Sequence, residues 1–510
     1  MLPVLAPAAT ADGPDGSALV AACQANQGQA PLAGPQACRS LLAAEWGVAA
    51  GCRTPFREVE GADTPEKCAV VDGRAVSEAQ VAGYEQGWTH RALSLQRELS
   101  SHLPLLDAPI VHTHNSFNSS AYRVPDPSDP AGGTYATVTN QDPNQAYSIS
   151  DQLRMDVRAI EVDAHWVHSP WAAPNAATNG GYEVTSCHGK SQGGNPVTVH
   201  VGCSWDRPFA STLAELRAWL TAHPDQFVLV YLENQLEHSS AGHERAGQLI
   251  AEGLGNLVYR PEAGTPCAPT PTAVTAADVL ATGHQVVLVG NCDGANGQAT
   301  SWGTWVHARG PAWLEEGGPA TYDDGECAAD MARRTSATPA FRRYYEEVTW
   351  LGYMGDTAPQ TAPAGHVQPI GVEAATRMAH CGVNLIGLDQ LTPTDPRLAA
   401  QVWSWAPSEP APGARCAYQG TDGRFHGTPV CQGVAEVRPY ACLDRAGGWH
   451  VTAATGTWDD GSQVCATEFE GSAFDVPRSG WSNDALAAAK PSPGTEVWLG
   501  YRGVGADWVS

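Results

Sequence analysis

Short apolar runs alternate with amphipathic patterns through the middle of the chain. Continuous aliphatic and β-branched runs predict buried strands at 108–113, 157–163, 227–232, 285–289 and 383–388. Residues 77–100 and 211–222 repeat apolar positions every three or four residues and predict helices. Buried strands that alternate with helices are typical of a parallel sheet covered on both faces. We therefore expect an α/β fold, a closed (β/α)8 TIM-like barrel.

The two ends of the chain have a different pattern. Residues 1–75 are rich in Gly, Ala and Pro and carry four cysteines, so we expect a disulfide-rich N-terminal extension, of which about 1–11 resembles the tail of an export signal. The barrel pattern occupies residues 76–406. A Pro-rich stretch at 405–413 indicates a linker. Residues 414–510 combine four cysteines with short strand patterns and predict a small β-rich domain.

The charge balance limits the choice of partners. The chain has 510 residues and a formal net charge of -25. Nucleic acid, or a polybasic grip on anionic lipid, is therefore excluded, because both partners would be repelled. An anionic substrate must be held by a local device such as a metal ion. No apolar run approaches the ~20 residues that a membrane span needs.

The 14 cysteines are even in number and fall in local groups that lack the spacing of metal fingers. They indicate seven disulfides and an oxidising compartment, so we expect a secreted, extracellular protein. Cys187 and Cys203 are interpreted as a loop staple, because no neighbouring base suggests a catalytic thiol.

Polar residues follow the ends of the predicted strands. His114 and Asn115 follow the first strand, Glu161 and Asp163 end the second, and Glu233 follows the third. Glu161 and Asp163 are two residues apart, so their side chains share one face of the strand. The chemistry of parallel barrels collects at the carboxyl ends of their strands. We therefore expect these five residues to lie close together.

Three further residues complete the candidate chemistry. His188 supplies a second imidazole, and Lys190, one of three lysines in the chain, is a candidate phosphate contact. Asp389 ends the last predicted strand and is a candidate substrate-binding residue or the orienting partner of a histidine. An exposed lysine and a capping aspartate are the alternatives for these two. Two histidines, three carboxylates and one amide suit the cleavage of a phosphodiester beside a divalent cation.

Four motifs in one order resemble the catalytic X region of phosphatidylinositol-specific phospholipase C, a family of distorted TIM barrels. The motifs are His-Asn at 114–115, Glu-x-Asp at 161–163 preceded by Val-Arg, His-Gly at 188–189 and Leu-Glu-Asn at 232–234. In that family one histidine is the general base on the inositol 2-hydroxyl and the other is the general acid for the glycerol oxygen. The resemblance implies that His114 is the base and His188 the acid. It also implies diacylglycerol and a cyclic inositol phosphate as products.

The resemblance implies a calcium site as well. Calcium-dependent members hold the ion with residues that correspond to Asn115, Glu161, Asp163 and Glu233. Metal-free bacterial members carry an arginine at the position of Asp163, and a carboxylate cannot supply that positive charge. Water and substrate oxygens can complete the about six to eight ligands that Ca²⁺ takes. We therefore expect Ca²⁺ as the cofactor, a phospholipid or other phosphodiester as the substrate, and transient contact with a membrane surface.

Other interpretations stay open. A glycerophosphodiester phosphodiesterase or a sphingomyelinase D-like enzyme uses paired histidines and Glu-x-Asp with a metal on the same barrel, although these families lack the His-Asn-Ser form of residues 114–116. A non-catalytic secreted binding protein is the alternative of another class. Taken singly, Glu161 and Asp163 also fit a solvated strand end, and Glu233 fits a salt-bridged one.

The C-terminal region resembles C-type lectin-like domains with their halves in swapped order. The resemblance implies two disulfides, Cys416 with Cys431 and Cys442 with Cys465, and a glycan as a candidate ligand. A disulfide-stabilised β domain without a ligand is the alternative.

Overall fold

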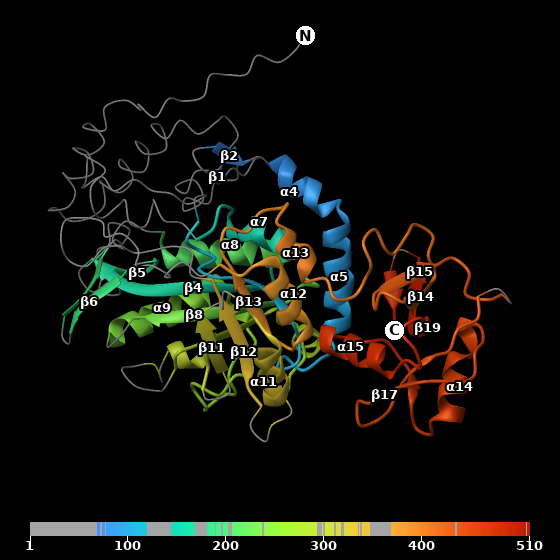
Figure 1. Ribbon diagram of the computed structural model, residues 1–510. Coiled ribbons are helices and arrows are strands. Elements are labelled where there is room, and N and C mark those ends of the chain that lie inside the picture. Colours follow the sequence, from blue (N-terminus) through green and yellow to red (C-terminus); the bar gives the residue numbers. More distant parts are fainter. Residues whose placement is uncertain are drawn as a thin grey trace, which may run out of the picture.

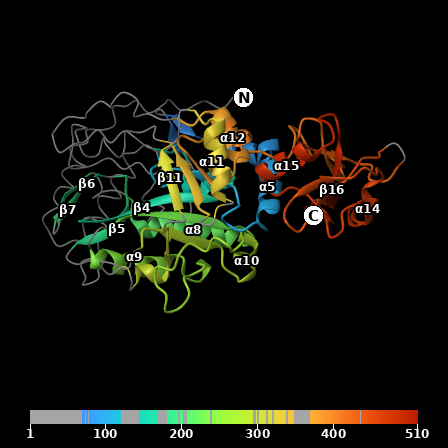
Figure 2. The same cartoon turned by 60° about the horizontal axis from the view of Figure 1, so that its bottom comes forward.

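A computed structural model describes residues 69–71, 74–76, 78–119, 144–168, 181–188, 190–194, 197–201, 207–236, 239–292, 298, 301–310, 313–317, 321–334, 336, 339–346, 369–433, 436–505 and 507–510. A curled parallel sheet with helices packed around it forms the larger part, and a second group of strands follows it (Figures 1 and 2). The predictions for residues 1–68, including the export signal and the four N-terminal cysteines, lie outside the described residues.

The central sheet has nine strands in the order β10-β9-β8-β4-β3-β13-β12-β11, with β5 (Tyr182–Ser186) antiparallel to β4. The other eight follow the circular order of a (β/α)8 barrel and pair in parallel: β3 (Ile110–Thr113), β4 (Ala159–His168), β8 (Val228–Gln235), β9 (Val286–Gly290), β10 (His307–Ala308), β11 (Trp313–Gly317), β12 (Phe341–Tyr345) and β13 (Leu385–Leu388). Within the described residues no ladder joins β10 to β11. The expected closed barrel is therefore observed as a curled parallel sheet that is open at this point.

The two faces of the sheet separate by residue parity. On β4, Ile160 and Val162 belong to the core beneath the helices, whereas Ala159 packs with Leu229 and Phe341 in a second cluster on the concave face. The concave face is apolar near the amino ends of the strands and charged near their carboxyl ends. This change of polarity along the strands places the candidate chemistry at one end of the fold.

Helices cover the convex face of the sheet (Figure 1). They are α7 (Ile149–Arg154), α8 (Phe209–Ala222), α9 (Ser240–Gly253), α11 (Asp324–Arg334), α12 (Val372–His380) and α13 (Pro396–Ala400), with 3-10 turns η3 (Gly255–Leu257) and η4 (Trp302–Thr304). α10 (Ala276–Ala281) instead packs Val279 and Leu280 with the concave-face cluster, near the amino ends of the strands. The helix expected at 211–222 is α8. Among the described residues, no helix combines the length and apolar character that crossing a membrane requires.

Two small hairpins lie outside the central sheet. β1 (Ala69–Val71) pairs with β2 (Arg74–Val76), and β6 (Lys190–Gly194) pairs with β7 (Val197–Val201). The first hairpin lies at the C-terminal end of the segment expected to be an N-terminal extension. Its three-residue strands are too short to give a recognisable alternation.

The single helix expected at 77–100 is two helices, α4 (Glu78–Glu85) and α5 (Trp88–Ser100). They break at Gly87, whose N–H donates to Tyr84 O (2.8 Å). The buried carboxylate of Asp156 fastens both helices to the sheet, accepting from Tyr84 Oη (2.8 Å), His90 Nδ1 (2.8 Å) and Arg97 Nη1 (2.8 Å).

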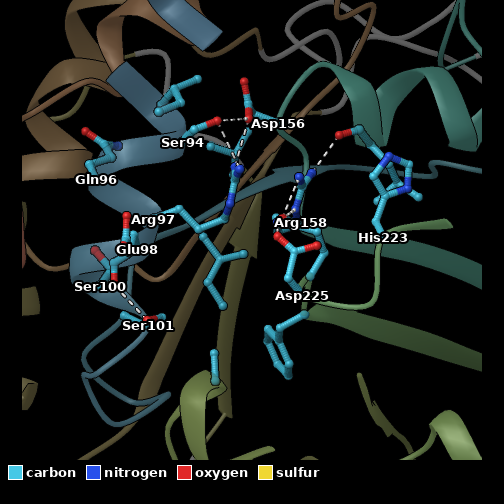
Figure 3. Close-up of a pocket in the computed structure, with 18 of the residues that line it drawn as sticks. Ser94, Gln96, Arg97, Glu98, Ser100, Ser101, Asp156, Arg158, His223 and Asp225 are labelled. Carbon is cyan, nitrogen blue, oxygen red and sulfur yellow. Dashed lines mark hydrogen bonds and ion pairs between the residues drawn. The ribbon is translucent and has the colours of Figure 1, made fainter. Parts of the chain in front are cut away.

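A cavity of about 660 Å³ opens beside this contact (Figure 3). Ile110, Arg158 and Phe227 line it from the amino ends of their strands. The N–H groups of Arg158 donate to Gln226 Oε1 and to the Leu153 and Val157 carbonyls. The cavity is therefore at the end of the sheet opposite to the candidate site.

The C-terminal elements lie on the far side of α5 (Figures 1 and 2). They comprise β14 (Cys416–Gln419), β15 (Phe425–Thr428), β16 (Ala441–Leu443), β17 (Trp449–Val451), η5 (Trp458–Asp460), α14 (Gly461–Glu468), β18 (Ala473–Phe474), α15 (Gly480–Ala489), β19 (Val497–Val504) and β20 (Asp507–Val509). Four strands form one sheet in the order β15-β14-β19-β20, and three form another in the order β17-β16-β18.

The stretch expected to be a linker, 405–413, is packed at its start and mostly exposed from Pro407 onward. Trp403 and Trp405 are fully buried, and the ring of Trp405 lies 4.7 Å from that of Trp508. Trp88 of α5 donates to Glu409 O (3.0 Å). A Pro-rich composition indicates a lack of regular structure, but it does not reveal that neighbouring tryptophans enter the core.

The predicted C-terminal disulfides, Cys416–Cys431 and Cys442–Cys465, are both present. Two more disulfides cross-link the larger part, Cys267–Cys292 and Cys327–Cys381. Cys187 is also disulfide-bonded, and the described cysteines include no free thiol.

Candidate active site

The carboxyl ends of four strands meet at one edge of the sheet. His188 follows β5, which pairs with the same end of β4. The other predicted residues gathered here are His114 and Asn115 after β3, Glu161 and Asp163 on β4, Glu233 on β8, and Asp389 after β13. The structure therefore brings these residues together at one edge, as expected for polar residues that follow parallel strands.

A tight turn after β3 presents His114 and Asn115. Asn115 has a φ of 43°, in the left-handed region, which Asn adopts more readily than most residues. Ser116 fixes the turn, since its Oγ donates to Thr113 O (2.9 Å) and accepts from Glu161 N (2.9 Å). The Asn115 N–H in turn donates to Glu161 Oε2 (3.1 Å). Side chain and backbone thus hold the turn against β4.

Three carboxylates converge beside this turn. The register of β4 and β8 sets Asp163 opposite Glu233, and one oxygen each from Glu161, Asp163 and Glu233 lies within 4.8 Å of the others. Burial, and then the charges of Glu233 and Glu161, raise the pKa of Asp163. Burial and Glu161 raise the pKa of Glu233 as well. A proton or a cation stabilises a cluster of this kind.

The donor set fits a divalent cation. Asn115 Nδ2 lies 3.2 Å from His114 Nε2, which leaves the amide oxygen for another partner. That oxygen and Asp163 Oδ1 are buried and have no hydrogen-bond partner among the described residues. Carboxylate and amide oxygens are the ligands that Ca²⁺ and Mg²⁺ prefer. The four predicted ligands, Asn115, Glu161, Asp163 and Glu233, therefore supply suitable atoms in one place.

The sequence did not point to Arg343 of β12, which lies next to these carboxylates. Its guanidinium contacts Glu161 Oε2 and, through Nη1, Glu315 Oε2 (3.0 Å). Its Nε donates to His112 Nε2 (3.2 Å). The side chain is buried. Asp163 stands where the metal-free enzymes of the resembling family carry an arginine. Arg343 nevertheless brings a guanidinium to the site from another strand, and its charge offsets part of the negative charge of the carboxylates.

His114 is held by Asp389. Its Nδ1 lies 3.2 Å from Asp389 Oδ1, and its Nε2 lies 4.0 Å from Glu161 Oε2. Burial opposes protonation, but these two carboxylates outweigh it and raise the pKa of His114 to about 9. The Asp389 N–H donates to Glu346, and Nη1 of Arg397 also donates to Glu346 (2.7 Å). The orienting residue is thus itself anchored by a buried ion pair.

His188 is half-buried and faces the same site. Its Nδ1 lies 3.1 Å from Asn118 Nδ2. Burial, and then the positive charge of His114, lower the pKa of His188. The two imidazoles therefore sit in opposite electrostatic environments, which favour protonated His114 and neutral His188. These are the reverse of the starting states that a base at His114 and an acid at His188 need. Lys190 is the first residue of β6, and the predicted phosphate contact of its side chain lies outside the described residues.

A family model described as the Rv2075c PI-PLC-like domain matches residues 70–395. Two proteins of Mycobacterium tuberculosis, "Uncharacterized protein Rv2075c" of strain H37Rv and "Uncharacterized protein MT2135" of strain CDC 1551, are each 34% identical to this chain over 449 residues. That alignment covers 85% of this chain and 84% of each relative.

Solved structures with detectable similarity include two bacterial enzymes. The phosphatidylinositol-specific phospholipase C of Listeria monocytogenes has a TM-score of 0.38 and 12% identity, and the similarity covers 60% of this chain and 98% of that one. The F249X mutant of the phosphatidylinositol-specific phospholipase C of Staphylococcus aureus has a TM-score of 0.34 and 12% identity, covering 62% of this chain and 98% of the other.

Proposed function

We propose, because this chain belongs to the Rv2075c PI-PLC-like domain family, that it is a phosphoric diester hydrolase of the phospholipase C type acting on phosphatidylinositol or a related phospholipid. The observation that carries the proposal is the placement of His114 and His188 around one end of the sheet beside Glu161, Asp163 and Glu233. Two proton carriers and a cation site are the groups that phosphodiester cleavage needs.

In this proposal His114 is the base and His188 the acid. His114 Nε2 takes the proton of the substrate hydroxyl, whose oxygen forms a bond to phosphorus. The bond from phosphorus to the glycerol oxygen breaks, and His188 donates a proton to that oxygen. The products are diacylglycerol and a cyclic phosphate. Asp389 stabilises the imidazolium that forms at His114, since it accepts from Nδ1.

Asn115, Glu161, Asp163 and Glu233 would hold a divalent cation, which we propose to be Ca²⁺. When bound, the cation lowers the pKa of the attacking hydroxyl and offsets the charge that develops on phosphorus. Its charge next to Glu161 also offsets one of the two attractions that favour protonated His114. The disulfides agree with our proposal of an extracellular protein.

The test is phosphorus NMR of the products formed from phosphatidylinositol with Ca²⁺ and with excess chelator. We expect a cyclic inositol phosphate with Ca²⁺ and no turnover without it. Asp163→Asn should weaken Ca²⁺ binding in a calorimetric titration. Full activity in chelator, with no metal by elemental analysis, would contradict the calcium proposal.

His114→Ala and His188→Ala should each lower turnover by about 10²- to 10⁴-fold. His102→Ala is the matched control, because this exposed histidine lies in the loop after α5 and should leave turnover unchanged. Release of choline from sphingomyelin, or of glycerol phosphate from a glycerophosphodiester, would favour the sphingomyelinase D-like or the glycerophosphodiesterase alternative. Turnover near the wild-type value in a folded His114→Ala or His188→Ala protein would remove that residue from the mechanism.

A further inference from the structure

We propose that Asn118 and Asn144 form an amide bridge that joins the two histidines and fixes a complementary tautomer on each. The two asparagines are positioning residues, since they act through the imidazoles. Their catalytic meaning rests on the proposed function, whereas the tautomer of neutral His188 is a property of the free protein.

The bridge is a continuous line of short contacts between buried side chains. Asp389 accepts from Asn144 Nδ2 through Oδ1 and Oδ2, both at 3.1 Å. Asn144 Oδ1 accepts from Asn118 Nδ2 (2.7 Å), and the same nitrogen lies 3.1 Å from His188 Nδ1. At the other end Asp389 lies 3.2 Å from His114 Nδ1. The line therefore runs from one imidazole to the other.

The carboxylate fixes the direction of every bond in this line. An ionised carboxylate only accepts, so Asn144 must turn its NH₂ group toward Asp389 and its oxygen toward Asn118. That oxygen also only accepts, so Asn118 must present its NH₂ group. The same NH₂ group faces His188, and Nδ1 of His188 must therefore accept. Neutral His188 then carries its proton on Nε2.

The same reasoning at the other end gives the opposite result for His114. Its Nδ1 faces the Asp389 carboxylate and must donate, so in the neutral ring Nε2 carries the lone pair, which faces Asn115 Nδ2. In their neutral forms His114 thus has an acceptor at Nε2 and His188 has an N–H at Nε2. Asp389 sets the first state directly and the second through two amides.

The backbone holds the bridge in place independently of the two amide side chains. Gln145 Nε2 donates to His114 O (2.7 Å) and Leu388 O (2.8 Å). The Gln145 N–H donates to Asn118 O (2.9 Å), and the Gln390 N–H donates to Asn144 O (2.7 Å). Three segments of the chain are joined by these bonds, so we expect side-chain substitutions at 118 and 144 to leave the fold intact.

The first experiment measures the tautomer of His188 in the wild-type protein by ¹⁵N NMR of histidine-labelled protein, with His188→Gln used to assign the signal. We expect Nε2 to be the protonated nitrogen. Protonation mainly at Nδ1 would overturn the proposal without any need for a variant.

The second experiment reverses the donor. Asn118→Asp keeps the shape of the side chain but offers only acceptors, so the proton of neutral His188 should move to Nδ1. Asn118→Leu removes the donor and should give a mixture of tautomers. Asn144→Leu removes the oxygen that orients the Asn118 amide, so it should also give a mixture of tautomers at His188. An unchanged His188 tautomer in Asn118→Asp would overturn the proposal.

Asn384→Leu is the control for the cost of burying leucine at an asparagine position. Asn384 is buried and bonds to the Leu106 carbonyl (2.7 Å), far from His188. The Asn384→Leu substitution should lower the melting temperature and leave the His188 signals unchanged. A shift of those signals as large as in Asn118→Leu would show a general packing effect and overturn the proposal.

Turnover then connects the bridge to the proposed function. Asn118→Leu and Asn144→Leu should lower kcat by about 10- to 100-fold with little change in KM, the usual effect of losing an orienting partner. Wild-type kcat in both variants would overturn the positioning role. If the wild-type protein cleaves no phosphodiester, the proposed function fails, while the tautomers still decide whether the bridge exists.

Discussion

Replacing Asp156 with Asn tests how the N-terminal helices are fastened to the sheet. The Asp156 side chain is fully buried and accepts from Tyr84, His90 and Arg97. Its φ of 68° is left-handed, which Asn tolerates as well as Asp does, so the change removes charge and leaves the backbone conformation available. Figure 3 shows Arg97 reaching from α5 toward this carboxylate.

The free energy follows from the pKa of the carboxyl group. Burial alone would raise the pKa of Asp156, but the hydrogen bond from His90 and the charges of Arg97, His90 and Arg158 outweigh burial and lower it to about 2. An unfolded aspartate has a pKa of about 3.9, so the charged form stabilises the folded state by about 2 to 3 kcal/mol. His90 and Arg97 are 31% and 27% exposed, so water compensates them in part when the charge is removed.

The sign of the pH dependence follows from the lowered pKa. The contribution is complete above the unfolded pKa and is lost as the pH falls from about 4 to about 2. Urea unfolding should therefore show Asp156→Asn about 2 to 3 kcal/mol less stable than wild type at pH 6, with about half of that difference at pH 3.

Asp225→Asn is the control, because this exposed carboxylate lines the same cavity and should change stability by less than about 0.5 kcal/mol. A difference between wild type and Asp156→Asn that is equal at pH 6 and pH 3, or that is absent at both, would refute the reasoning.

Two further substitutions test packing and charge. Gly480→Ala places a Cβ against the Ala379 carbonyl where α15 meets α12, and should lower the free energy of unfolding by about 1 to 3 kcal/mol. Gly371→Ala is the control, because its Cβ meets open space and should lower that free energy by less than about 0.5 kcal/mol. Equal effects of the two substitutions would contradict the tight contact at Gly480. Arg343→Met removes the guanidinium that pairs with the buried Glu161 carboxylate and should lower the free energy of unfolding by about 3 to 5 kcal/mol. An unchanged melting temperature would mean that this ion pair does not stabilise the fold.

The sequence predicted the strands that have an apolar outer face and missed those that do not. The runs at 108–113, 157–163 and 227–232 correspond to β3, β4 and β8, with ends shifted by up to five residues. β12 reads Phe-Arg-Arg-Tyr-Tyr, so neither an apolar run nor a clean alternation marks it. Its two arginines are buried because each forms an ion pair with a carboxylate that is distant in the sequence, and the local sequence pattern does not show these pairs.

The site divides in the same way. Position after a strand was enough to gather His114, Glu161, Asp163, Glu233 and Asp389, because parallel strands end at one edge. The position after a strand gave no indication that Arg343 contacts Glu161. It also did not indicate that Asn118 and Asn144 lie between the two histidines. Those contacts connect residues far apart in sequence, and no local spacing records them.

The left-handed turn at Asn115 makes this position informative in a saturation library. Glycine would keep the backbone conformation and lose the oxygen, aspartate would keep both and add a charge, and valine or isoleucine would lose both. A ranking of substitutions by folding yield should therefore differ from a ranking by metal binding. On the extended strand at Glu161 the backbone sets no such separate demand. A comparison of tolerance at these two positions would separate what the chain requires of its shape from what the reaction requires of its atoms.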